Sequence, residues 1–312
     1  MANDSIIITG GTGFVGRHLI RELQERSSFS RVVSFDRIVD DIPAGATGYG
    51  VDITDSTTYA HLLREIQPDW VIHLAAVSSV GFSLTHPDIT RTTNVFATEE
   101  LMKNALAARS DTKFLIVSSA DIYGISSPTA IPELLLSACH PSNPYAQSKF
   151  EMEQMVEEKY NEHCIRVRPF PHIGPGQRTG FVTADFSSQI AAIEKGKQAP
   201  EILVGNLEAK RDFTDVRDVV RAYRLLIEKG MFGEVYHIAS GQAYSIQHVL
   251  DSLLAMSTSP ITVQQDESRM RPSDTPVLIG AIDKITAETG WKPEIPLQTS
   301  LQDILNDWRT KD

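Results

Sequence analysis

The chain has 312 residues, of which 41% are hydrophobic and 22% are charged, and its formal net charge at pH 7 is −11. These values are typical of a soluble globular protein with two unequal, closely apposed domains, and they argue against a disordered or fibrous chain. The negative charge also argues against a general nucleic-acid or anionic-membrane surface, so any anionic ligand must be met by locally placed arginine and lysine side chains.

The number of cysteines and the length of the apolar segments bear on the cellular location of the protein. Cys139 and Cys164 are too few for a disulfide framework and lack the spacing of a metal site, so we expect no metal. Residues 1–4 lead straight into a predicted strand without a leader pattern, and no apolar run reaches membrane-spanning length. We therefore predict a cytoplasmic protein that binds neither membranes nor nucleic acids.

A glycine-rich turn joins the first predicted strand, residues 5–9, to a predicted helix, residues 17–26. The spacing Gly-xx-Gly-xx-Gly permits a tight turn and a close approach of the backbone to a pyrophosphate, which the helix N-terminus attracts. This context favours dinucleotide binding over a simple turn. The residues of the turn that we expect to contact the cofactor are Gly10, Gly13, Phe14, Val15 and Gly16.

The next predicted strand, Arg31–Phe35, is followed by Asp36, some twenty residues past Gly16. A carboxylate at this point can bind the hydroxyls of the adenosine ribose, which favours NAD. The neighbouring Arg37 could instead accept the additional phosphate of NADP. We predict NAD as the cofactor, with NADP as the alternative.

Further cofactor contacts are predicted where later strands end. Residues 51–55 resemble a strand end followed by a helix cap, and a simple cap explains Asp52 nearly as well as a contact with the adenine. The predicted strand 70–74 ends in small residues that leave room for a cofactor, and its His73 is expected to be packed rather than to act as a base. Asn94, in a helix predicted for 90–108, could bond backbone or cofactor. The contacts expected from these segments and from the later loop are Asp52, Ile53, Leu74, Ala75, Ala76, Asn94 and His172.

The alternation of strands and helices predicts right-handed crossovers and an α/β fold with a doubly wound parallel sheet of the Rossmann type. We expect a dinucleotide-binding domain at 1–168 and a smaller C-terminal α/β domain that binds substrate at 169–312. The segment of about 214–240 is expected to return to the first domain, although the strand at 235–239 is also interpreted, with the helix at 245–256, as completing the smaller domain. The alternating charges from Thr214 to Val220 indicate a solvated helix face and ion pairs between elements, not a metal site.

Three residues are predicted to move a proton. Tyr145 and Lys149 are four apart in a helix that Asn143-Pro144 begins, so both project from one face. An adjacent ammonium favours the phenolate and is expected to lower the pKa of Tyr145 toward neutrality. Ser119, after the predicted strand 113–117, could hold the same substrate oxygen. Alone, the Tyr-xxx-Lys pair would more often be an ordinary surface feature.

Taken together, the glycine turn, Asp36, residues 73–76 (His-Leu-Ala-Ala), Ser119 and Tyr145-xxx-Lys149 resemble the extended short-chain dehydrogenase/reductases that act on nucleotide sugars. The resemblance runs essentially end to end and implies catalytic roles for Ser119, Tyr145 and Lys149. It also implies a homodimer in which the Thr90 and Tyr145 helices pair with their symmetry mates.

Within that family, the residue at Asp121 discriminates among reactions. The 4,6-dehydratases usually carry Glu there, the UDP-galactose epimerases usually carry no carboxylate, and Asp resembles the GDP-4-keto-6-deoxymannose reductases. A turn-forming role for Asp121 is an equal alternative.

The second half carries the resemblance into the substrate site. Residues 169–177 are similar to the family's Pro-Phe-Asn-His-Ile-Gly-Pro-Gly-Gln, but Pro171 replaces an Asn that usually bonds the substrate and has no backbone donor. Residues 206–212 resemble the GDP-sugar branch, which favours guanine, and two arginines are expected to clamp the diphosphate. The substrate contacts implied by the resemblance are Ser79, Ser119, Asp121, Phe170, Arg178, Asn206, Arg211 and Arg271.

The predicted activity is NAD(P)H-dependent reduction of the C4 keto group of GDP-4-keto-6-deoxymannose to GDP-rhamnose. The alternatives are a GDP-mannose 4,6-dehydratase or a nucleotide-sugar 4-epimerase, which return the hydride to the product and so retain their cofactor. A non-catalytic dinucleotide sensor is more remote, because a sensor has no need of Ser119, Tyr145 and Lys149.

Overall fold

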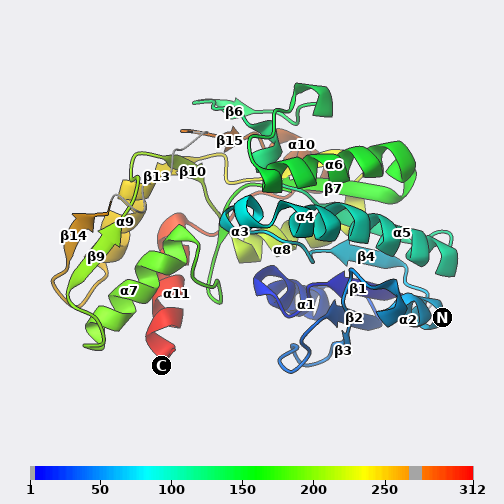
Figure 1. The fold of residues 1–312 in the computed structure, drawn as a ribbon, viewed down its shortest axis with the longest axis horizontal. Coiled ribbons are helices and arrows are strands. Elements are labelled where there is room, and N and C mark those ends of the chain that lie inside the picture. The colour runs from blue at the N-terminus through cyan, green and yellow to red at the C-terminus, as the bar shows by residue number, and fades with distance from the viewer. Residues whose placement is uncertain (1–3, 267–275, 312) are drawn as a thin grey trace.

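The computed structural model describes residues 4–266 and 276–311 and is built around one seven-stranded parallel sheet (Figure 1). The strand order is β12-β7-β5-β4-β1-β2-β3. In chain order these strands are β1 (Ser5–Thr9), β2 (Arg31–Asp36), β3 (Thr47–Gly50), β4 (Trp70–His73), β5 (Lys113–Val117), β7 (Cys164–Pro169) and β12 (Val235–Ile238). The parallel sheet confirms the predicted Rossmann-type fold class.

Helices cover both faces of this sheet, because its strands are apolar on both sides. Alternate residues of β1 show the division: Ile7 packs into one buried cluster, whereas Ile6 and Ile8 pack into the other. The first cluster includes side chains of α2 (Ala60–Ile66), α5 (Ala97–Ala108) and α6 (Pro144–Lys159). The second includes side chains of α1 (Phe14–Arg26), α8 (Val216–Lys229) and α10 (Asp283–Thr289).

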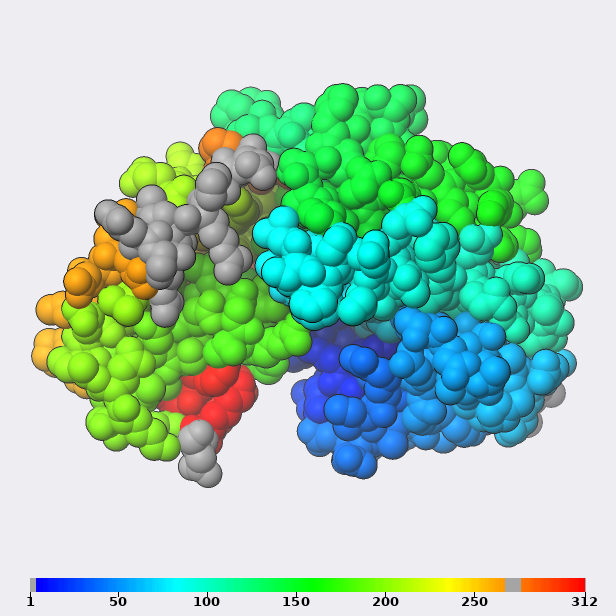
Figure 2. Space-filling view, viewed as in Figure 1, coloured from blue at the N-terminus to red at the C-terminus, as the bar shows by residue number. Residues whose placement is uncertain are grey.

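A third buried cluster holds together a smaller group of elements, which lies to the left of the sheet in Figure 1. Its helices are α7 (Val182–Glu194), α9 (Ile246–Ala255) and α11 (Leu297–Thr310), and β9 (Glu201–Val204) pairs with β14 (Thr262–Gln265). The remaining strand pairs are β10 (Lys210–Asp212) with β13 (Ala243–Ser245), β8 (His172–Ile173) with β11 (Thr214–Asp215), and β6 (Ala130–Ile131) with β15 (Ile279–Gly280). Figure 2 shows the surface hollowed between α11 and the N-terminal part of the chain.

Several local predictions need correction. The strand predicted at 235–239 is β12, an edge strand of the large sheet, so it does not complete the smaller group. The helix predicted for 90–108 is interrupted: α4 (Pro87–Arg91) passes through a π-helical segment, η2 (Thr92–Phe96), into α5. The strand before Asp52 ends at Gly50, and the loop 169–177 contains the short strand β8.

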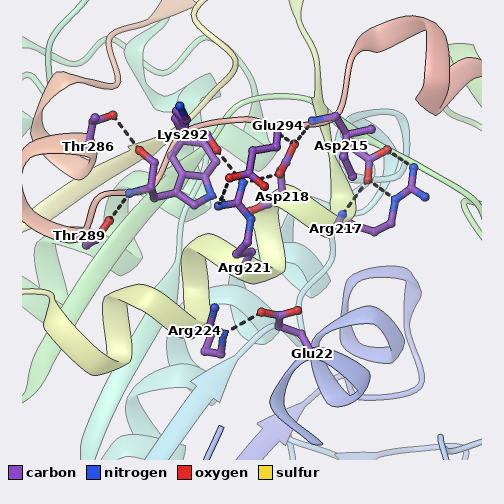
Figure 3. Close-up of polar contacts among 12 residues, drawn as sticks. Glu22, Asp215, Arg217, Asp218, Arg221, Arg224, Thr286, Thr289, Lys292 and Glu294 are labelled. Carbon is purple, nitrogen blue, oxygen red and sulfur yellow. Dashed lines mark hydrogen bonds and ion pairs between the residues drawn. The ribbon is translucent and has the colours of Figure 1, made fainter. Parts of the chain in front are cut away.

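The alternating charges at the start of α8 form ion pairs, as predicted, but the predicted solvated face is wrong, because Asp215 and Asp218 are buried (Figure 3). Arg217 contacts Asp215 and Asp303 at 2.8 Å each. Arg221 contacts Asp218 at 2.6 Å. A further pair, Arg224 Nε to Glu22 Oε1 at 2.7 Å, joins α8 to α1. These contacts fasten α8 to the first helix and to the C-terminal segment.

Within the described ranges, no group of His, Cys, Asp and Glu side chains could hold a metal ion. No helix in the described part of the chain has both the length and the apolar character needed to cross a membrane.

Candidate active site

The site forms at the carboxyl edge of the sheet, where β5 ends and a short 3-10 helix, η3 (Ala120–Tyr123), begins. Ser119 is the N-cap of η3, and its Oγ accepts a hydrogen bond from the backbone N of Asp121 at 3.1 Å. A serine cap satisfies one of the backbone donors that a helix start leaves unpaired. This cap fixes the Ser119 hydroxyl at the edge of the sheet.

Helix α6 brings Tyr145 and Lys149 to the same place. Asn143 caps it, with its Oδ1 accepting from Ala146 N at 2.9 Å, and Pro144 occupies the first turn. Lys149 is buried and its Nζ donates to Val117 O, at the end of β5, at 2.8 Å. The Ser119 hydroxyl lies close enough to the Tyr145 phenol to influence its pKa. The structure therefore assembles the three residues that the sequence singled out.

The protonation of this group differs from the prediction. Burial raises the pKa of Tyr145, the Asp121 carboxylate raises it further, and the Ser119 hydroxyl only partly opposes them. Burial lowers the pKa of Lys149 to about 8, opposed by the charge of Glu153. The prediction that Lys149 lowers the pKa of Tyr145 is thus wrong for this structure, because burial dominates both pKa values and the charges that act on Tyr145 and Lys149 are those of Asp121 and Glu153.

The charges of Asp121 and Arg211 act on each other in this site. Solvent reaches Asp121, yet the surrounding protein raises the pKa of its carboxyl, and Arg211 opposes that rise. Burial likewise lowers the pKa of the Arg211 guanidinium, and Asp121 opposes that change. Asp121 also raises the pKa of Tyr145, so a carboxylate, a guanidinium and a phenol influence one another here.

The glycine turn lies beside β1 and β4. Gly10 has a φ of 72°, and a Cβ there would lie 3.0 Å from Ala75 N. A Cβ on Gly16 would lie 2.2 Å from Gly10 O, so only glycine fits at that contact. Gly13 caps α1 without a side-chain hydrogen bond. Phe14 and Val15 then form its first turn, next to backbone that can approach a phosphate closely.

Asp36 ends β2 and is fixed against this turn. Its Oδ2 accepts from Thr12 N at 3.1 Å and from Thr12 Oγ1 at 2.7 Å, while Oδ1 accepts from Arg37 N at 2.8 Å. A carboxylate has about four acceptor positions, so one remains for a ribose hydroxyl. The Arg37 side chain is exposed beside it, and its charge reaches Asp52.

Other predicted cofactor residues take local roles. Asp52 accepts from Thr54 N and Oγ1 at 2.9 and 2.7 Å, which is a local turn rather than a helix cap, since Asp55 caps the short helix η1 (Ser56–Thr58). Ile53 packs in the core. Asn94 is buried, bonds both backbone groups of Val77 and donates to Ser148 Oγ at 2.9 Å, so it braces backbone. The backbone N–H groups of Leu74 and Ala75 donate to Thr9 Oγ1, and Ala76 follows them, partly exposed.

The two histidines near the edge differ in setting. His73 is packed, as predicted: it contacts Thr9 Oγ1 at 2.8 Å and Thr98 Oγ1 at 2.9 Å, and burial lowers its pKa to about 3. His172 stacks on Phe14, with 6.1 Å between ring centroids, and burial lowers its pKa as well. The stack joins the loop after β7 to the start of α1.

The predicted substrate residues are less uniformly placed. Phe170 is 1% exposed and meets the His237 ring edge-on at 5.1 Å, so its side chain belongs to a core cluster. The Ser79 hydroxyl caps α3 (Val80–Thr85), accepting from Phe82 N at 3.2 Å. Asn206 Oδ1 accepts from Glu208 N at 2.9 Å, and Arg178 is exposed. Arg271 lies outside the described residues.

Sequence reasoning missed a buried ion pair behind the site, between Glu153 of α6 and Arg168 of β7, at 2.8 Å. The available signal was chemical: each charge falls at a position that its element otherwise fills with buried side chains. Buried charges are rarely found without a specific partner.

Comparison with known proteins agrees with this architecture. Residues 7–304 match the family described as GDP-mannose 4,6 dehydratase. The GDP-6-deoxy-D-mannose reductase of Pseudomonas aeruginosa is 34% identical, over 98% of this chain and 97% of the relative. The GDP-6-deoxy-D-talose 4-dehydrogenase of Aggregatibacter actinomycetemcomitans is 31% identical, over 90% of this chain and 89% of the relative.

A solved structure, RMD from Pseudomonas aeruginosa complexed with NADPH, superposes with a TM-score of 0.85 at 33% identity, covering 98% of this chain and 99% of that one. The match runs through both the large sheet and the smaller group of elements. It confirms the resemblance to the extended short-chain dehydrogenase/reductases. This chain belongs to the GDP-mannose 4,6 dehydratase family, within the extended short-chain dehydrogenase/reductases.

Proposed function

We propose that this protein reduces the C4 keto group of GDP-4-keto-6-deoxymannose to the alcohol of GDP-rhamnose, using NAD(P)H. The observation that carries the proposal is the convergence of Ser119, Tyr145 and Lys149 at the end of β5: Ser119 Oγ accepts from Asp121 N, Lys149 bonds Val117 O, and both Ser119 and Asp121 act on the pKa of Tyr145. The similarity to a GDP-6-deoxy-D-mannose reductase supports the substrate class. The Asp at 121, where dehydratases of the family usually carry Glu, supports reduction.

The proposed chemistry assigns one task to each residue. Bound NAD(P)H supplies a hydride to the C4 carbon. Ser119 donates a hydrogen bond to the carbonyl oxygen and polarises it, and Tyr145 gives its proton to the alkoxide that develops there. The Lys149 ammonium, one helical turn away, then faces the phenolate that results. Arg211 holds the diphosphate, as a guanidinium can bind two phosphate oxygens at once.

The proposed cofactor site comprises the glycine turn, Asp36 and the small residues after β4. Asp36, with an acceptor left over, supports the ribose contact expected for NAD, while the exposed Arg37 supports the additional phosphate of NADP. The relative solved with NADPH supports the second possibility. We assign the cofactor as NAD(P), and titration with NADH and NADPH decides which of the two is preferred.

The test is stoichiometric. Incubated with the purified keto sugar, the protein is expected to oxidise one NAD(P)H for each alcohol formed. A dehydratase or an epimerase regenerates its cofactor within each cycle, so product without net oxidation assigns one of those activities instead. Binding of NAD(P)H with no turnover of any of these sugars supports the sensor.

We propose further that two copies pair through α3, α4 and α6, which lie side by side in Figure 1 and form one face in Figure 2. This face exposes large apolar side chains, which monomers rarely gather in one region. They are Phe82, Leu84, Ile89 and Phe96. A monomer in sedimentation at working concentrations would contradict the dimer.

We also propose the division into a dinucleotide-binding domain at 1–168 and a substrate domain at 169–312, with about 214–240 belonging to the first. The packing of α8 and β12 with the large sheet supports that assignment. The two cysteines described are free and buried, which supports the reducing environment of the cytoplasm.

A further inference from the structure

A buried polar network lies directly behind the proposed site and joins three elements. The guanidinium of Arg168, 1% exposed, bonds Glu153 through both Nε and Nη2, at 2.9 and 2.8 Å. Its Nη1 donates to Leu134 O at 2.6 Å and to Tyr123 OH at 3.0 Å. Arg168 thus uses its fork to connect α6, η3 and the loop between them.

The donors and acceptors of this network run in one direction. Because Tyr123 OH accepts from Arg168, its own proton is available for His237 Nε2, with which it is hydrogen bonded. His237 is then the tautomer with its proton on Nδ1, which faces Ala281 O at 3.3 Å. Burial and the Arg168 charge hold the pKa of His237 at about 3, so the ring is neutral and the chain is complete.

The two ends of the ion pair belong to the elements that carry the reacting groups. Tyr145, Lys149 and Glu153 are spaced by four residues on α6, and all three are buried, so they follow one face of the helix. Tyr123 is the last residue of η3, whose first turn is capped by Ser119 and contains Asp121. Gly124 follows in the left-handed region. A Cβ there would lie 1.7 Å from His140 O, so the end of η3 packs directly against the backbone of His140.

We infer that Glu153 and Arg168 are positioning residues, which hold Ser119 and Asp121 of the η3 turn at the correct distance from Tyr145 and Lys149 of α6. This inference rests on the proposed reductase function for its kinetic readout. Neither residue has to touch substrate or cofactor. The geometry matters because a misplacement of about 1 Å between reacting groups can cost about a hundredfold in rate.

The decisive variant is the double substitution Glu153→Leu with Arg168→Met. Replacing a buried ion pair by apolar side chains of similar volume is often neutral for stability, whereas removing one partner leaves a buried charge. We expect a urea midpoint lowered only by the loss of the Arg168 bonds to Leu134 O and Tyr123 OH, a kcat lower by about tenfold to a hundredfold, and a Kd for NADPH within about threefold, because the glycine turn is untouched. If the ion pair had only a structural role, a double variant that keeps its stability would also keep its activity. A double variant that is stable and within about twofold of the parent kcat overturns the inference.

Two further variants make the outcome secure. The pair Lys159–Glu99 at 2.6 Å joins α6 to α5 at the surface, so Lys159→Met with Glu99→Leu is the matched control and should retain full kcat. Tyr123→Phe removes the hydroxyl that links η3 to both Arg168 and His237, and it decides the question if the double variant does not fold. We expect a kcat about tenfold lower for Tyr123→Phe, with the KM for the sugar nucleotide little changed. Full kcat in that variant refutes the inference.

The inference and the proposed function fail in different ways. If the parent protein oxidises no NAD(P)H with the keto sugar, the proposed function is wrong. The positioning role is then decided by crystal structures of the parent and the double variant. A displaced η3 turn supports it, and a superimposable turn rejects it.

Discussion

Replacing Lys149 with methionine should abolish reduction and, at neutral pH, make the protein more stable. Lys149 is 4% exposed and carries its charge into the carboxyl edge of the sheet. Burial lowers its pKa from 10.5 to about 8, even with Glu153 opposing the shift. The lysine is therefore retained in the fold at a cost in free energy, which its role beside Tyr145 explains.

The magnitude follows from the shift. Each pKa unit corresponds to about 1.4 kcal/mol, so the drop to about 8 amounts to roughly 3 kcal/mol against the charged form. The side chain also loses its bond to Val117 O on substitution, which offsets about 1 kcal/mol. We expect Lys149→Met to gain about 2 kcal/mol in free energy of unfolding at about pH 7.

The sign of the pH dependence is fixed by linkage. Between about pH 8 and pH 10.5 the unfolded chain binds a proton on Lys149 that the folded chain has released, so the parent gains stability as pH rises through this window. The methionine variant lacks that gain. Its advantage should therefore be complete below about pH 8 and should disappear by about pH 10.5.

Urea unfolding of parent and variant at several pH values measures this difference, and NAD(P)H oxidation measures the activity. Lys159→Met, an exposed substitution on the same helix, is the control and should leave the urea midpoint unchanged and the activity within about twofold of the parent. If Lys149→Met is less stable than the parent at neutral pH, the reasoning about buried charge is refuted. In the parent, kcat should also fall above about pH 8, as the ammonium is lost.

Three more predictions concern the proton donor, the cofactor and the dimer. Tyr145→Phe should lower single-turnover hydride transfer by at least about a hundredfold and leave the Kd for NADPH within about threefold, whereas unchanged turnover would remove Tyr145 from the chemistry. Arg37→Ala should weaken NADPH binding by about tenfold or more and NADH binding little, measured by fluorescence titration, and equal losses would show that Arg37 does not read the additional phosphate. Ile89→Glu, at a side chain 52% exposed, should yield monomers in sedimentation with the fold intact by circular dichroism, and a persistent dimer would place the interface elsewhere.

Local patterns in the sequence were sufficient for the large sheet. Runs such as Ser5–Thr9 and Lys113–Val117 are short, apolar and bounded by turns, and the structure has strands with those bounds. The glycine spacing likewise predicted a strand, a turn and a helix. Gly10 and Gly16 stand where the backbone of the turn comes so close to neighbouring backbone that a Cβ would be strained. The spacing of Tyr145 and Lys149 required only a helix to bring them onto one face.

Properties that depend on tertiary packing could not be predicted from local sequence patterns. The pKa of Tyr145 was expected to fall because the sequence shows a neighbouring lysine, but it cannot show how completely the fold removes water from both groups. Phe170 lies in a loop motif and resembles a ligand contact, yet it packs against His237 from a strand far along the chain. The pairing of Glu153 with Arg168 joins a helix to a strand, and no sequence spacing encodes it.

The charge on the cofactor connects the state of Tyr145 to the direction of the reaction. Reduction begins with NAD(P)H, whose nicotinamide is neutral, and requires a phenol that still has its proton to give. Dehydration and epimerisation begin with oxidation, which requires a phenolate, and there the positive nicotinamide would favour that form by lowering the phenol pKa. In this structure burial and the Asp121 carboxylate both hold Tyr145 protonated. The negative charge beside the phenol therefore separates this site from the UDP-galactose epimerases, which usually carry no carboxylate there, whereas the 4,6-dehydratases carry a carboxylate as well and differ by its length.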